Sequence, residues 1–137
     1  MKIVLTKDMM RIEKEQDVVL FRNRVKEYAV KIAMSLVNQT KLITAASELV
    51  RNMLKYAGGG IVSIEVITEG RDSGIRLTFD DKGPGIKDIS LAMKDGYSSG
   101  KSLGIGLPGT KRLVNEFDIK SIFGEGTKVT IIKWKNG

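Results

Sequence analysis

The sequence is organised around Asp81–Gly109, DKGPGIKDISLAMKDGYSSGKSLGIGLPG, which holds seven of the fifteen glycines and both prolines of the chain. Glycine at this density indicates backbone that lies where side chains would obstruct it. The stretch begins with an acidic residue directly after a strand-like segment, and it ends directly before a helix-like segment. The two ends therefore predict backbone that comes close to a ligand.

Outside this stretch, hydrophobic periodicity predicts the helices and strands. The expected helices are 17–36, 40–57, 88–95 and 107–117, and the expected strands are one or two within 2–15, then 61–67, 75–80, 119–123 and 127–134. Asp17 and Thr40 are the expected N-caps, and Asn38–Thr40 is the expected break between the first two helices. Many charges within 2–15 predict an edge strand.

This order of elements predicts an α+β fold, an α/β sandwich in which helices cover one face of a single mixed or antiparallel sheet. Gly70–Gly74 and Gly124–Gly126 carry turn residues, so the strands that flank each of them are expected to pair antiparallel. At 137 residues the chain is expected to form one domain, 1–137. Residues 96–103 have the polar, glycine-containing composition of a lid.

Composition excludes several classes of protein. The chain has no cysteine and no histidine, so it has no disulfide, zinc–thiolate site, thiol nucleophile or histidine base. Hydrophobic residues make up 42% of the sequence, yet no run of about 18 of them suggests a membrane span. The N-terminal residues lack a signal-peptide profile. We therefore expect a cytoplasmic protein with no membrane contact.

The net charge of +7 raises the question of nucleic acid. The 23 lysines and arginines are scattered, however, and aromatic residues are only 6% of the chain, too few for an obvious base-stacking surface. No nucleic-acid partner is therefore expected. A nucleotide or an acidic protein explains the charge more simply.

Glu48 and Asn52 lie four residues apart and share one face of the second predicted helix, with Lys55 close to the same side. A carboxylate can accept a proton from an attacking hydroxyl. An amide oxygen can be the single protein ligand of a hydrated Mg²⁺ beside phosphates. A solvated helix face is the alternative interpretation.

Asp81, Gly83 and Gly85 follow a predicted strand. A carboxylate in this place can accept a hydrogen bond from an exocyclic amine, as on adenine, and the glycines let backbone approach a flat ring. A tight surface turn is the alternative. Further along, Gly104-Ile105-Gly106 precedes a helix whose free N–H groups and dipole favour an anion, and Lys101 could add positive charge there. Gly124–Thr127 is compatible with an ordinary hairpin turn.

Taken in order, these four segments resemble the N, G1, G2 and G3 boxes of the GHKL ATPase superfamily, and the resemblance extends over nearly the whole chain. Within the superfamily the chain resembles small bacterial serine/threonine kinases with a Bergerat-type nucleotide site. Two branches compete, the stressosome switch kinases and the anti-sigma-factor kinases. The segments that favour the switch kinases are Ser47–Asn52, Asp95–Ser98, Leu103–Gly109, Lys111–Leu113 and Ile132–Trp134.

The resemblance implies an ATP- and Mg²⁺-dependent protein kinase, with Glu48 as the catalytic base and Asn52 as the metal ligand. It further implies a set of nucleotide-binding residues, namely Asn52, Lys55, Asp81, Gly83, Gly85, Ile86, Met93, Lys101, Gly104, Ile105, Gly106, Leu107 and Thr127. Of these, Asp81 and Thr127 would recognise adenine, and Ile86 and Met93 would line the base. One departure is Lys101-Ser102, where switch kinases tend to carry two glycines.

The resemblance also implies partners. A switch kinase phosphorylates serine or threonine on STAS-domain proteins and activates a regulatory phosphatase when it is released. In the other branch the partner is a sigma factor, which the nucleotide-bound protein sequesters.

Overall fold

Five strands form one antiparallel sheet, in the order β1-β2-β3-β5-β4, in the residues that the computed structural model describes, 1–94 and 106–137. The strands are β1 (Ile3–Ile12), β2 (Gly60–Glu69), β3 (Asp72–Asp81), β4 (Glu116–Ile122) and β5 (Gly126–Trp134). Each neighbouring pair runs antiparallel. Of the two predicted kinds of sheet, the antiparallel one is therefore confirmed.

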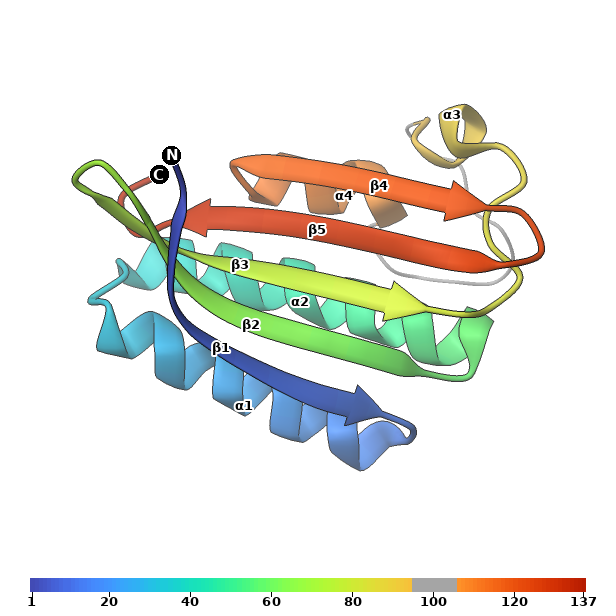
Figure 1. Cartoon of the computed structure of the whole chain (residues 1–137), viewed down its shortest axis with the longest axis horizontal. Helices are drawn as coiled ribbons and strands as arrows, with labels where there is room; N and C mark the ends of the chain where they lie inside the picture. Colours follow the sequence, from blue (N-terminus) through green and yellow to red (C-terminus); the bar gives the residue numbers. More distant parts are fainter. Residues whose placement is uncertain (95–105) are drawn as a thin grey trace.

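The helices described are α1 (Glu15–Lys31), α2 (Leu36–Ala57), α3 (Ile89–Ala92) and α4 (Gly106–Leu113). Figure 1 shows α1, α2 and α4 together behind the sheet, whereas α3 lies beyond the end of the sheet where β4 turns into β5. Helices therefore cover one face of the sheet, as predicted. None of the described helices is long and apolar enough to cross a membrane.

The core lies between the helical layer and the sheet. Alternate residues of β3 point to the helices, and Ile75, Leu77 and Phe79 are almost completely buried there. The ring of Phe79 meets that of Phe21 on α1 edge to face, with centroids 5.7 Å apart and an interplanar angle of 83°. Such a pair adds orientation to the apolar burial, because the ring edge is attracted to the ring face. It ties α1 to β3 on the helical side of the sheet.

The boundary between α1 and α2 differs from the prediction. Ser35 is the N-cap of α2, because its Oγ accepts a hydrogen bond from the N–H of Asn38 at 3.2 Å. Asn38 and Thr40 lie inside the helix, and the chain reverses earlier, at Ala33 with φ of 60°. Asn38 is a polar residue in a helix because its amide donates to the carbonyl of Lys135 at 3.2 Å. Its polarity therefore reflects a long-range contact, and the predicted break and Thr40 cap are wrong.

The N-terminal region also differs in detail. β1 is one ten-residue edge strand with an irregularity in its pairing between Val4 and Thr6. Asp17 lies in the first turn of α1, where its carboxylate accepts hydrogen bonds from the N–H groups of Glu13 and Lys14 at 2.8 and 3.1 Å. The cap position belongs to Lys14, so the expectation that Asp17 is the N-cap is wrong by three residues.

The last predicted helix is shorter in the structure. α4 ends at Leu113, and Phe117 belongs to β4. Leu113 and Phe117 are four residues apart, which imitates helical spacing, although both pack against the same core from different elements. The N–H of Asn115 donates to the carbonyl of Ile132 at 2.9 Å, and this bond carries the chain from the helix into the sheet.

One end of the sheet gathers the segments predicted to bind a ligand. β3 ends there at Asp81, β4 turns into β5 there, and the C-terminal end of α2 lies behind them (Figure 1). The predicted hairpin of β4 and β5 is confirmed. The chain termini lie together at the opposite end (Figure 1).

Candidate active site

Asp81 is held by two backbone donors. Its Oδ1 accepts a hydrogen bond from the N–H of Gly83 at 2.9 Å and another from the N–H of Thr127 at 3.2 Å. Thr127 is its cross-strand partner on β5. Among the described residues, Oδ2 has no hydrogen-bond partner. The carboxylate therefore has a fixed orientation and keeps one free acceptor oxygen.

Three glycines let this segment pack closely against its neighbours. A Cβ on Gly83 would overlap the side chain of Ala57 at the end of α2 and lie 2.8 Å from its Cα. Gly85 has φ of +73°, and a Cβ there would overlap the carbonyl of Ile122. A Cβ on Gly126 would overlap the carbonyl of Asp81. Glycine is therefore required by contacts between segments, in addition to the turn geometry.

Glu48 lies at the N-terminus of α4. Its Oε1 accepts a hydrogen bond from the N–H of Gly106, the first residue of that helix, at 3.3 Å. The free N–H groups and the dipole of a helix attract negative charge at this point. The side chain of Glu48 therefore occupies a position suited to an anion.

Asn52 follows Glu48 by one turn of α2 and is half-buried. No hydrogen bond engages its amide among the described residues, so its oxygen is available to a ligand. No group of three or more acidic, histidine or cysteine side chains forms a metal cluster in residues 1–94 and 106–137. A hard oxygen donor beside a carboxylate fits Mg²⁺, which takes most of its ligands from water and phosphate.

The remaining predicted residues that the structure describes are exposed or half-buried. Lys55 is exposed, and its ammonium lies 5.1 Å from the ring centroid of Tyr56. Met93 is half-buried at the C-terminus of α3. Leu107 is half-buried and packs against the hydrophobic core. Lys101, Gly104 and Ile105, like the predicted lid, lie outside the described residues.

Ser121 is a site residue that the sequence motifs do not reveal. Its Oγ accepts a hydrogen bond from the N–H of Ile86 at 2.7 Å, lies 2.8 Å from Oγ1 of Thr127, and donates to the carbonyl of Gly126 at 3.2 Å. Alternation along β4 puts Ser121 on the same face as Phe117 and Ile119. A hydroxyl at a core-facing strand position was the signal that could have revealed it.

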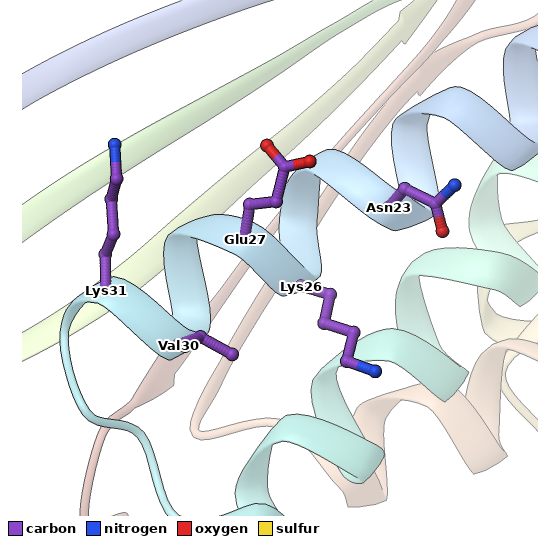
Figure 2. Close-up of a pocket in the computed structure, with 5 residues that line it drawn as sticks. All are labelled: Asn23, Lys26, Glu27, Val30 and Lys31. Atoms are coloured by element: carbon purple, nitrogen blue, oxygen red, sulfur yellow. The ribbon is translucent and has the colours of Figure 1, made fainter.

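A surface hollow of about 530 Å³ lies elsewhere, along the outer side of α1. Figure 2 shows that its lining residues, Asn23, Lys26, Glu27, Val30 and Lys31, all come from this one helix. None of the predicted site residues lines it. The hollow is therefore separate from the candidate active site.

The family follows from comparison with known proteins. Residues 37–136 match the family described as histidine kinase-, DNA gyrase B-, and HSP90-like ATPase. The chain belongs to this family, and the predicted GHKL-type fold is confirmed.

Within the family, the chain is 43% identical over 124 residues to the serine/threonine-protein kinase RsbT of Bacillus subtilis (strain 168), covering 90% of this chain and 93% of the relative. It is also 29% identical over 128 residues to the anti-sigma F factor of Clostridium kluyveri, covering 89% of each chain.

Two solved structures are similar in fold. One contains the RsbU and RsbW domains of a Mycobacterium tuberculosis protein, with a TM-score of 0.63 and 18% identity, covering 92% of this chain and 32% of that one. The other is the mycobacterial sensor histidine kinase MprB, with a TM-score of 0.55 and 17% identity, covering 94% and 97%. At these identities the likeness concerns the fold alone.

Proposed function

We propose that the chain is an ATP-dependent protein serine/threonine kinase of the RsbT type. The observation that carries this proposal is the 43% identity to RsbT over nine-tenths of the chain. The geometry is compatible with it, because Asp81, Glu48 and Asn52 lie on elements that meet at one end of the domain.

In this proposal Asp81 selects the nucleotide. Oδ1 is engaged by Gly83 and Thr127, so Oδ2 accepts a hydrogen bond from the exocyclic amine of adenine. A site with a fixed acceptor discriminates strongly against a base that presents a carbonyl instead, because two acceptors then face each other unpaired. The close packing of Gly83 and Gly85 sets the position of this segment.

The reacting groups lie on α2. The substrate hydroxyl oxygen forms a bond to the γ-phosphorus, the bond from that phosphorus to the β–γ bridging oxygen breaks, and Glu48 takes the hydroxyl proton. Asn52 would hold Mg²⁺, which supplies charge neutralisation at the phosphates. The N–H groups at the start of α4 add further positive potential.

The bond between Glu48 and Gly106 has a consequence for this scheme. A phosphate at the N-terminus of α4 and the carboxylate of Glu48 would compete for the same N–H group. Nucleotide binding therefore releases Glu48 from Gly106, and the freed carboxylate can accept the proton from the substrate.

We further propose that the substrate is a STAS-domain protein and that the released kinase activates a regulatory phosphatase in the cytoplasm. Resemblance to the switch kinases supports these partners. A second candidate function is an anti-sigma factor with kinase activity, supported by the 29% identity to an anti-sigma F factor. The higher identity to RsbT favours the first function.

The test is phosphoryl transfer from γ-labelled ATP to a purified STAS-domain protein. We expect label on a serine or threonine. Glu48→Gln keeps an acceptor for the Gly106 N–H but is a far weaker base, so transfer should slow by about 10²–10⁴-fold while ATP affinity stays within about threefold. Thr44→Ala, one turn earlier on the exposed side of α2, is the matched control. Absence of transfer together with capture of a sigma factor would overturn the first function.

A further inference from the structure

We propose that Ser121 is a positioning and specificity-determining residue for the adenine base, and that it acts through the hydroxyl of Thr127. The inference rests on the proposed nucleotide site. Ser121 lies opposite Thr127 across the β4–β5 pair, and Thr127 lies opposite Asp81 across the β3–β5 pair. The three side chains therefore form a row across the end of the sheet.

The hydrogen bonds around Ser121 determine where its proton goes. The N–H of Ile86 can only donate, and the carbonyl of Gly126 can only accept. Thr127 can do either. Only one assignment of the protons makes all three contacts of Ser121 Oγ hydrogen bonds. In it, Ile86 and Thr127 each donate to Ser121, and Ser121 donates to the carbonyl of Gly126.

In this arrangement the hydroxyl proton of Thr127 is committed to Ser121. The lone pairs of Thr127 Oγ1 then remain as acceptors, on the residue directly opposite Asp81, whose Oδ2 is also an acceptor. Two acceptors on neighbouring strands match the two hydrogens of a 6-amino group, and they repel the carbonyl of a 6-oxo purine. Ser121 therefore makes Thr127 selective for adenine without touching the base.

Ser121 also ties residues 81–86 to the β4–β5 hairpin. The hydrogen bond from the N–H of Ile86 to Ser121 holds the backbone just after Gly85. A second hydrogen bond, from the N–H of Gly124 to the carbonyl of Pro84 at 2.7 Å, holds the backbone just before it. A purely structural role through Ile86 would affect all nucleotides alike. A role through Thr127 would affect adenine nucleotides selectively.

The experiment measures dissociation constants of ATP and inosine triphosphate for the whole chain by isothermal titration calorimetry, with thermal unfolding measured without nucleotide. Ser121→Ala should weaken ATP about tenfold, as expected for one hydrogen bond, and should reduce the preference for ATP over inosine triphosphate by a similar factor. In a Thr127→Val background the same substitution should leave that preference unchanged. Ser63→Ala, a buried serine on β2, is the control.

An unchanged preference in folded Ser121→Ala would overturn the proposal, as would an equal effect in the Thr127→Val background. If Ser121→Ala does not fold, Thr127→Val alone removes the acceptor while the Ile86 bond remains, and a wild-type preference in that variant overturns the proposal. Failure of the parent protein to bind ATP would instead refute the nucleotide site itself.

Discussion

Asp81→Asn separates the structural role of Asp81 from its role toward the nucleotide. The asparagine side chain keeps a carbonyl oxygen that can accept the N–H groups of Gly83 and Thr127, as Oδ1 does at 2.9 and 3.2 Å. Its NH₂ group replaces the free Oδ2. The substitution therefore preserves the internal bonds and turns a charged acceptor into a donor at the position that faces the base.

The size of the effect follows from this exchange. A hydrogen bond to a charged group contributes about 1.5–3 kcal/mol, which corresponds to about 10- to 150-fold in the dissociation constant of ATP. Because both backbone donors keep an acceptor, the free energy of unfolding should change by less than about 1 kcal/mol. A 6-oxo purine now meets a donor, so the preference for ATP over inosine triphosphate should shrink or reverse.

Calorimetric titration with both nucleotides gives the affinities, and urea unfolding without nucleotide gives the stability. Asp80→Asn is the matched control, because it makes the same change at the neighbouring exposed residue of β3. ATP affinity equal to that of the parent protein in folded Asp81→Asn would refute the assignment of Asp81 to the base.

Three further predictions concern other parts of the molecule. Asn52→Ala should abolish the Mg²⁺-dependent gain in ATP affinity, tenfold or more, and leave binding in excess EDTA unchanged. Gly85→Ala should lower the free energy of unfolding by about 1–3 kcal/mol in urea titrations, because its φ is +73° and its Cβ would overlap the Ile122 carbonyl. Burial lowers the pKa of Lys133 from its usual 10.5, with a contribution from the charge of Lys41. Between the lowered pKa and 10.5 the unfolded chain binds more protons than the folded chain, so stability should rise with pH in that window, and Lys133→Met should remove this slope in thermal unfolding.

Each of these has a result that would contradict it. Equal ATP affinity of Asn52→Ala and the parent protein at every Mg²⁺ concentration would remove Asn52 from the metal site. If Gly85→Ala has the same free energy of unfolding as the parent protein, residues 81–86 can move away from β4 at no cost, and the close contact with Ile122 does not constrain them. A persistent slope in Lys133→Met, with Lys128→Met on the exposed side of β5 as control, would assign the titration to another group.

Much of the fold was predictable because secondary structure follows local periodicity. β-Branched residues predict the strand at 61–67, and glycine predicts the hairpin turn at Gly124–Gly126. The errors fell where a residue serves a distant contact. Asn38 imitates a helix break because its partner, the carbonyl of Lys135, is 97 residues away in the sequence. The predicted helix at 107–117 extends too far because Leu113 and Phe117, four residues apart, pack against the same core from different elements.

At the site, the sequence alone shows which residue types are available: a carboxylate and an amide one helical turn apart at Glu48 and Asn52, and an acidic residue before Gly83. Which of their atoms remain free depends on the folded arrangement. The register of β3, β5 and β4 lines up Asp81, Thr127 and Ser121, and the packing of α4 on α2 places Gly106 against Glu48 across 58 residues. Periodicity is a local property of the chain, whereas strand register and helix packing depend on the whole core. The pattern of donors and acceptors around Asp81 therefore forms only when β3, β5 and β4 have paired.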